Sequence, residues 1–272
     1  MPHCLISEIE TKYIRSLVSR EKRVDSRGLN DIRQITIECG IVEKANGSAR
    51  VTLGNTKVIV GVKAEIGTPY PDTPNSGVIT CAAEFIPMAS PYFEPGPPNE
   101  EAVELARVVD RGIRESKMVD LEKLCIIPNE KVWILFVDIY IIDHAGNLFD
   151  ASSLAAVSAL LTTKIPRTEV EDGKLKILDE RIPLPINNIP ISLTFAKIDD
   201  QLCVDPILEE ENVMDCRITI VYDVNNNLVA MQKGERGALT TQDIYKAVDL
   251  AETMTKEIRE KYISPILKQE VS

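Results

Sequence analysis

The sequence predicts an α+β fold in which two layered β/α halves share one domain. Short segments of alternating apolar residues run from residue 35 to residue 86, and a nearly continuous apolar stretch follows at 131–143. A second group of strand-like segments begins near residue 191 and ends in a long helical segment. This order of strands and helices is typical of α+β proteins. At 272 residues, the chain is long enough to bury roughly three quarters of its unfolded surface.

The first half opens with a helix and a polar loop. Residues 6–20 show helical periodicity, and the loop follows at Arg23–Gly28. Gly54 and Asn55 mark a tight hairpin between two strand-like segments. Alternating apolar residues predict strands at 35–39, 49–53, 58–64 and 78–86.

An ordered loop and a capped helix come next. Pro87–Pro98 is too rich in proline and glycine for regular structure, whereas Asn99 is a good N-cap for a following helix. Lys131–Asp143 is apolar and β-prone almost throughout, which predicts a central strand covered on both faces. After a turn at His144–Asn147, Ala151–Thr163 is small and apolar nearly all round, which predicts a buried helix.

The second half follows a polar connection that contains Gly173. Strand patterns occur at 191–197, 202–205, 217–222 and 228–232, and a long helix is predicted at 240–262. We therefore divide the chain into an N-terminal helix and loop (1–30), a first half (31–166), a connection (167–190) and a second half with the long C-terminal helix (191–264).

Composition excludes several classes of protein. No apolar run of about 18 residues could span a membrane, and the N-terminus lacks the features of a secretory signal, so we expect a cytoplasmic protein. The net charge of −11 argues against nonspecific binding of nucleic acid, so any contact with RNA requires a local basic patch. We expect neither a metal nor a cofactor, and we expect buried free thiols because no C-x-x-C pair exists among Cys4, Cys39, Cys81, Cys125, Cys203 and Cys216.

The strongest candidate site is a row of arginines on the helix after Asn99. At 100° per residue, the apolar residues Ala102, Leu105, Ala106, Val109 and Ile113 share one face. Arg107, Arg111 and Arg114 gather on the opposite face. Arginine offers a planar fork for phosphate and can stack on bases, so this face is a candidate RNA-binding surface.

The alternative interpretation of these arginines is an ordinary solvated helix face. Glu104 could pair with Arg107, Asp110 with Arg114, and Arg111 with Glu115. Periodicity alone leaves both interpretations open.

Other candidate sites are weaker. An acidic run could bind a divalent metal but lacks ligand spacing, so a solvated loop is the favoured interpretation. His144 lies in a turn beside Asp143, and with only one other histidine in the chain we expect no metal or catalytic triad there. Gly234–Gly237 contains no phosphate-binding motif. The acidic run consists of Asp199, Asp200, Asp205, Glu209, Glu210, Glu211 and Asp215.

Several strings of residues resemble the RNase PH-like subunits of exosomes, and specifically the archaeal type that lacks its own active site. The main strings are Phe93–Pro98 and Glu104–Arg111, and the resemblance extends over about residues 20–262. Further strings are Arg23–Arg27, Tyr70–Gly77, and Val204–Pro206 with Glu209–Glu211. The resemblance implies an RNase PH fold and a complex that degrades RNA from its 3′ end with inorganic phosphate.

Two positions in this chain depart from the active members of that family. Active members bind phosphate with a Gly-Ser/Thr-Arg turn before the buried helix, and the matching turn here is Asn147-Leu148-Phe149, which lacks both the hydroxyl and the cation. Alignment of Glu209–Ile218 places Arg217 where active members carry a catalytic aspartate, and a cation cannot act as that carboxylate. We therefore expect no catalytic residues in this chain.

The resemblance also implies partners. It implies a hexameric ring of three heterodimers with a catalytic RNase PH-like subunit, together with RNA-binding cap subunits. Arg107 and Arg111, with Arg114 as a further contributor, would bind the backbone of a single-stranded RNA 3′ end. Two alternatives stay open, namely a self-sufficient phosphorolytic exoribonuclease that uses Asp205 and Asp215, and a small-molecule binder or purely structural ring component.

Overall fold

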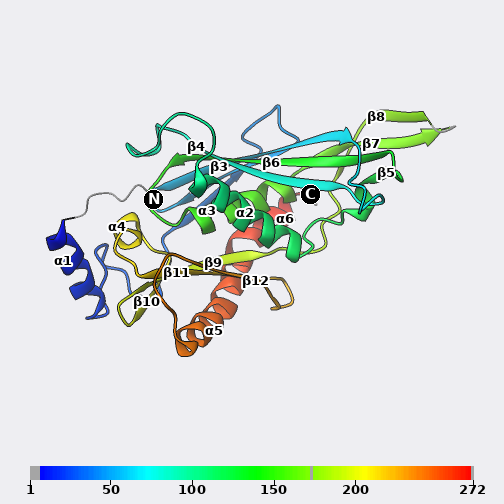
Figure 1. Cartoon of the computed structure of the whole chain (residues 1–272). Helices are drawn as coiled ribbons and strands as arrows, with labels where there is room; N and C mark the ends of the chain where they lie inside the picture. Colours follow the sequence, from blue (N-terminus) through cyan, green and yellow to red (C-terminus); the bar gives the residue numbers. More distant parts are fainter. Residues whose placement is uncertain (1–6, 172–173, 271–272) are drawn as a thin grey trace.

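The computed structural model describes residues 7–171 and 174–270, which form alternating layers of sheet and helix (Figure 1). The large sheet has the strand order β1-β2-β3-β6-β4, and β5 also pairs with β6. β4 and β6 are parallel, and the other pairs are antiparallel. The strands are β1 Ile35–Cys39, β2 Gly47–Leu53, β3 Thr56–Gly67, β4 Val78–Phe85, β5 Cys125–Ile127 and β6 Lys131–Asp143.

Two helices lie under the large sheet. α2 (Glu100–Glu115) begins where the Asn99 side chain accepts a hydrogen bond from the Ala102 amide at 2.9 Å, as predicted for an N-cap. α3 (Leu148–Leu161) is buried along its whole length and packs on β2 and β3 on one side and on β9 on the other. The prediction of a buried, apolar helix is therefore confirmed. α3 forms the centre of the core.

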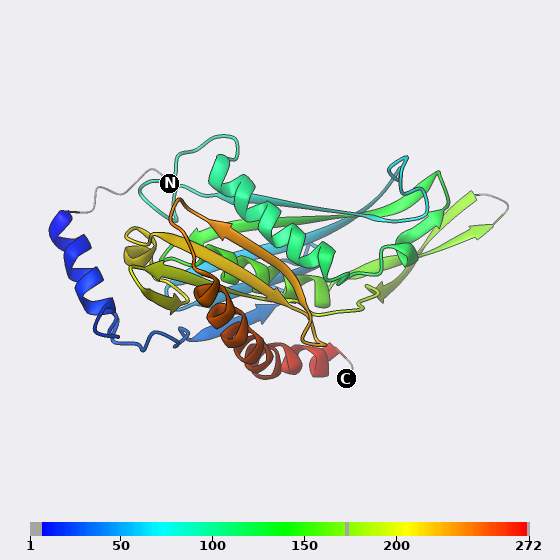
Figure 2. The same ribbon diagram turned by 60° about the horizontal axis from the view of Figure 1, so that its bottom comes forward.

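The smaller sheet and the C-terminal helices complete the layers (Figure 2). The sheet is antiparallel in the order β10-β9-β11-β12, and its far face is covered by α5 (Thr241–Ile258). A π-helical turn joins α5 to α6 (Ser264–Glu270). The predicted α+β fold class is confirmed. The strands are β9 Ile191–Ile198, β10 Gln201–Val204, β11 Cys216–Tyr222 and β12 Leu228–Gly234, with the short helix α4 at Leu208–Glu211.

Strand β6 is central, but the prediction that both its faces are covered is wrong. Leu135, Val137 and Ile139 lie on the face that packs on α3 and are buried. On the other face Phe136 is only half-buried and Tyr140 is 38% exposed. Because both helices lie on the same side of the sheet, the outer side of β6 is left without a helix from the described residues.

The segment predicted as a polar connection contains a hairpin that the sequence analysis did not anticipate. β7 (Lys164–Glu171) and β8 (Lys174–Pro183) pair in an antiparallel ribbon that projects from the end of the large sheet (Figure 1). Its charged residues obscured the alternation that marks a strand, because neither face of a projecting ribbon is fully buried.

The N-terminal helix α1 (Glu8–Val18) contacts the second half. Arg15 forms ion pairs with Asp199 and, at 2.9 Å, with Asp215. No described helix is long and apolar enough to cross a membrane. The prediction of buried thiols is confirmed for Cys203 and Cys216. Cys81 and Cys125 are only half-buried, and the prediction is wrong for Cys39, which is exposed on edge strand β1. Cys4 lies outside the described residues.

Candidate functional site

The outer face of α2 carries the three predicted arginines. Arg107, Arg111 and Arg114 are all exposed, whereas the apolar side of the helix is buried against β4 and α3. A second side of α2 is also buried, through Val108 and Gly112, and faces the smaller sheet. The arginine row is therefore a narrow exposed strip between two buried sides.

The ion pairs expected of an ordinary helix surface form only in part. Arg114 pairs with Asp110 at 3.0 Å, as the alternative interpretation predicted. Glu104 instead binds Arg217, from a distant part of the chain, at 2.5 Å. Among the described residues, none forms a hydrogen bond or ion pair with the side chain of Arg107 or Arg111. Two cations on this face are therefore free to bind a ligand.

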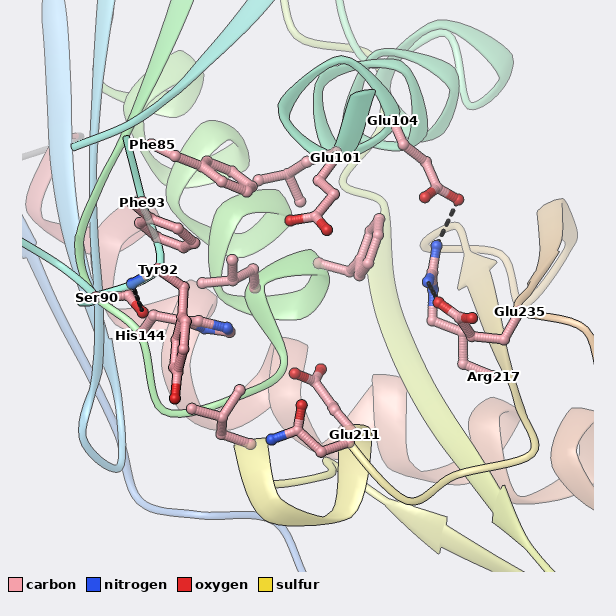
Figure 3. Close-up of a pocket in the computed structure, with 15 residues that line it drawn as sticks. Phe85, Ser90, Tyr92, Phe93, Glu101, Glu104, His144, Glu211, Arg217 and Glu235 are labelled. Atoms are coloured by element: carbon pink, nitrogen blue, oxygen red, sulfur yellow. Dashed lines mark hydrogen bonds and ion pairs between the residues drawn. The ribbon is translucent and has the colours of Figure 1, made fainter. Parts of the chain in front are cut away.

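A pocket of about 90 Å³ lies next to this helix, between α2, the proline-rich loop and the start of α3 (Figure 3). Aromatic side chains form one wall. Phe93, from the loop, stacks on His144 with ring centroids 5.5 Å apart and lies 4.7 Å from the ring of Phe85. Burial lowers the pKa of His144 to about 4, so the imidazole is neutral at physiological pH.

Phe149 and Arg217, the two positions expected from the sequence to depart from active members, contact each other in this pocket. The guanidinium carbon of Arg217 lies 4.1 Å from the centroid of the Phe149 ring, a cation–π contact. Arg217 also binds Glu104 and lies 3.9 Å from Glu235 (Figure 3). Its side chain is only 4% exposed. Gly234 lies opposite on β12, where a Cβ atom would come within 2.5 Å of the guanidinium carbon.

Glu211 is a buried carboxylate at the amino end of α3. Its Oε1 accepts a hydrogen bond from the backbone amide of Asn147, the N-cap of that helix, at 2.8 Å. Its Oε2 has no hydrogen-bond partner among the described residues. Burial raises the pKa of Glu211 to about 7 despite the nearby Asn147 amide and Arg217. Part of the anion-binding capacity of this helix end is therefore already used by the protein itself.

The acidic run is not a solvated loop throughout, so that interpretation is wrong for Asp205, Glu210 and Glu211, which are buried. Both carboxylate oxygens of Asp205 bind Arg33, at 2.7 and 2.9 Å. Burial acts to raise the pKa of Asp205, but the hydrogen bonds from Arg33 hold it below its ordinary value.

A second buried ion pair stands beside the first. Arg23, 3% exposed, donates Nε to Glu210 Oε1 at 2.8 Å and Nη2 to the other oxygen of that carboxylate. Gly146 lets the turn before α3 pack against this region, because a Cβ atom there would lie 2.5 Å from the Leu208 amide and its φ is +91°. Together these contacts fix the turn at the start of α3.

The sequence singled out Glu104 and Glu211, but it predicted neither the pocket nor their place in its wall. Glu104 lies only 40° from apolar Val108 on the helical wheel, which was a signal that this side of α2 faces protein. Nothing local marked the burial of Glu211, because its contacts come from residues far away in the sequence. No group of three or more His, Cys, Asp or Glu side chains in the described residues could hold a metal ion.

Comparison with known families finds two matches that together cover most of the chain. Residues 31–166 match the 3′ exoribonuclease family, domain 1, and residues 188–254 match domain 2 of the same family.

Named relatives are similar over almost the full length. The exosome complex component Rrp42 of Methanothermobacter thermautotrophicus is 55% identical over 91% of this chain and 92% of its own. The protein of that name from Thermococcus kodakarensis is 50% identical over 96% and 97%.

Solved structures agree in fold. A chain of an Archaeoglobus fulgidus exosome with RNA bound to the active site has a TM-score of 0.86 and 46% identity, and the match covers 93% of this chain and 98% of that one. Rice Rrp46, at 18% identity and a TM-score of 0.67, shares the fold.

Proposed function

The chain belongs to the 3′ exoribonuclease family of RNase PH-like proteins, and from that premise we propose that it is the non-catalytic RNase PH-like subunit of an archaeal exosome. In this role it holds RNA beside an active site supplied mainly by a partner chain. The complex degrades RNA from the 3′ end with inorganic phosphate.

The observation that carries the RNA-holding role is the pair of uncommitted arginines on α2. Arg107 and Arg111 stand on the same exposed face, and no described residue neutralises either of them. In a chain with a net charge of −11, two unpaired guanidinium groups side by side form a local binding surface for phosphate. Arg114, already paired with Asp110, contributes less. Because the contacts are to phosphate, binding is largely independent of base sequence.

The pocket supports the absence of catalysis in this chain. Leu148 and Phe149 supply neither a hydroxyl nor a cation for phosphate, and Glu211 takes the Asn147 amide. Arg217, at the position assigned to the catalytic aspartate, is held by Phe149 and Glu104. Four carboxylates and one guanidinium line the pocket, which repels an incoming phosphate. The carboxylates are Glu101, Glu104, Glu211 and Glu235.

The partners in this proposal follow from the family. They are a catalytic RNase PH-like subunit, in a ring of three heterodimers, and the RNA-binding caps, all in the cytoplasm. The relatives are named as exosome components, and a similar chain belongs to an archaeal exosome core. The half-exposed apolar row on β6, which includes Ile134 and Phe136, suits a surface that contacts another chain.

The alternative of a self-sufficient phosphorolytic exoribonuclease requires Asp205 and Asp215 as catalytic acids, and both carboxylates are already bound by other residues. Asp205 is buried and bound by Arg33, and Asp215 pairs with Arg15 at 2.9 Å and accepts a hydrogen bond from the Asp199 amide. Neither carboxylate is free to bind a metal ion or to transfer a proton to substrate.

The test is an assay of labelled single-stranded RNA with inorganic phosphate. We compare this chain alone, the catalytic partner alone and the reconstituted mixture. We expect release of nucleoside diphosphates by the mixture far faster than by the partner alone, and none by this chain alone. Release by the isolated chain would favour the self-sufficient enzyme.

The same assay includes the double variant Arg107→Glu with Arg111→Glu. We expect RNA affinity of the reconstituted complex to fall about tenfold or more at moderate salt, with assembly unchanged by size-exclusion chromatography. The matched control is Lys12→Glu with Arg20→Glu, which makes the same change in charge on two exposed residues, Lys12 in α1 and Arg20 just after it. Equal RNA affinity in the wild-type and Arg107/Arg111 complexes would contradict the proposed surface.

A further inference from the structure

The pocket beside α2 has a chemical character opposite to that of a phosphate site. Besides its four carboxylates it contains the single guanidinium of Arg217, which Phe149, Glu104 and Glu235 already occupy. Half of the other lining residues are aromatic, namely Phe85, Tyr92, Phe93, His144 and Phe149. A pocket with negative charges and aromatic faces suits a cation, because carboxylates attract it directly and ring faces attract it through their quadrupole.

Glu211 provides the specific observation that points to a ligand. It is 92% buried, it lines the pocket, and its carboxylate is directed into the cavity (Figure 3). One oxygen is satisfied by the Asn147 amide, and the other has no partner in the described part of the chain. A buried carboxylate oxygen without a donor is costly, and a ligand with an N–H group would supply the missing hydrogen bond.

We propose that this pocket binds a small organic cation whose ammonium or guanidinium group donates a hydrogen bond to Oε2 of Glu211 and lies against the aromatic wall. A bare metal ion fits less well, because no three ligating side chains in the described residues converge. The proposal is independent of RNA binding by α2, because Arg107 and Arg111 do not line this pocket.

Two sources could present this group. One is a diffusible amine or guanidine, and the other is a lysine or arginine side chain of a neighbouring subunit. The two differ in what assembly does to the pocket, because a side chain from a partner would fill it only in the complex.

The test measures binding of methylguanidinium and methylammonium to the full chain by NMR titration. Tetramethylammonium, a cation without N–H donors, serves as the matched ligand. We expect the first two to shift signals of residues around the pocket and to bind at least about tenfold more tightly than tetramethylammonium, as the loss of a hydrogen bond to a charged group predicts. Inorganic phosphate is expected not to bind there.

The variant Glu211→Gln keeps the shape of the side chain and removes its charge, and we expect it to weaken binding about tenfold or more. The matched control is Glu209→Gln, an exposed residue of the same short helix that does not line the pocket. Equal affinity of the wild type and Glu211→Gln, or binding of phosphate in the pocket, overturns the proposal.

A pH series on the wild-type chain gives the answer even where Glu211→Gln fails to fold. Affinity should rise from pH 5.5 to pH 8 as Glu211 loses its proton, since burial raises its pKa to about 7. Of the other groups around it, His144 stays neutral over this range because burial lowers its pKa to about 4, and Asp205 keeps its charge because, despite burial, the hydrogen bonds from Arg33 hold its pKa below the ordinary value. No binding at either pH, or affinity that does not change, refutes the assignment.

The reconstituted complex separates the two sources. Methylguanidinium binding that persists in the complex assigns the pocket to a diffusible amine, whereas binding lost on assembly assigns it to a side chain of the neighbouring subunit.

Discussion

On α2, Arg107 and Arg111 extend into solvent without a described partner, whereas Arg23, which is buried, and Arg33, which is half-buried, contact carboxylates near the start of α3. The two pairs of side chains are chemically identical. They differ in burial and in the number of acceptors that the fold places around each guanidinium. The single guanidinium group of Arg23 donates hydrogen bonds to Glu210 and to the carbonyl oxygens of Val204 and Asp205.

Burial and the number of nearby acceptors therefore distinguish arginines that stabilise the fold from arginines that are available to bind a ligand. A buried guanidinium needs an acceptor for nearly every N–H, so the fold must supply carboxylates and carbonyls around it. An exposed guanidinium hydrogen-bonds to water and gains from a ligand instead. The first kind should affect stability when replaced, and the second should affect RNA binding.

The largest expected effect comes from Arg23→Met. This change leaves Glu210 buried without its cation, and breaking a buried ion pair by removal of one partner costs about 3–5 kcal/mol of unfolding free energy. Urea unfolding of the purified chain measures it. Arg107→Met is the control and should change stability by no more than about 0.5 kcal/mol. A similarly small loss of unfolding free energy in Arg23→Met and Arg107→Met would contradict the distinction between structural and binding arginines.

An intermediate effect concerns Glu211, a buried carboxylate that has no ion-pair partner among the described residues. Since its pKa is raised from the ordinary value of 4.5 to about 7, the folded chain holds this proton more tightly than the unfolded chain. Its contribution to the unfolding free energy is therefore greatest below pH 4.5, is lost as the pH rises toward 7, and amounts to about 3 kcal/mol.

Glu211→Gln removes this titration. We expect the stability of the variant relative to wild type to improve by up to about 3 kcal/mol between pH 4.5 and pH 8, as measured by urea unfolding at each pH. Glu209→Gln, which changes an exposed carboxylate nearby, should show no such trend. If the difference in unfolding free energy between Glu211→Gln and wild type does not change with pH, the pKa of Glu211 is not raised and this prediction is wrong.

The smallest effect distinguishes arginines within the α2 row. Arg114 is paired with Asp110, so Arg114→Ala should weaken RNA binding by the complex by only a few tenths of a kcal/mol. Arg107→Ala should cost more and should reduce the slope of log affinity against log salt by about 0.7, as expected for one phosphate contact on a single strand. Equal effects of the two substitutions would show that the Asp110 pair does not matter.

Much of the fold could be predicted because local patterns report it directly. β6 was predicted with its correct ends, since apolar periodicity follows the packing of each element. The buried helix was predicted at 151–163, whereas α3 begins at Leu148 and ends at Leu161. The same run of apolar residues in β6 misled on one point. When the uncovered face of a strand is itself apolar, its sequence shows the same continuous run of apolar residues as a strand that is covered on both faces.

The candidate site was only partly predictable. The arginine row follows from helical spacing alone, and its exposure is confirmed. The partners of Glu104 and Glu211 could not be predicted, because Arg217 and Asn147 are brought to them by tertiary packing over separations of 113 and 64 residues. Spacing shows which side chains share an element, but not which elements meet.

We propose that Phe149 and Arg217 stand where the active members carry catalytic groups, and their contact then decides how those groups could be restored. Phe149→Arg alone would set two guanidinium groups against each other, since the ring it replaces lies 4.1 Å from Arg217. Arg217→Asp alone would add a carboxylate beside Glu104 and Glu235. Each single reversal meets like charge, so a path back to activity must pass through an unfavourable intermediate or change several residues together. Under the proposed assignment, single substitutions at Phe149 or Arg217 are therefore not expected to restore activity.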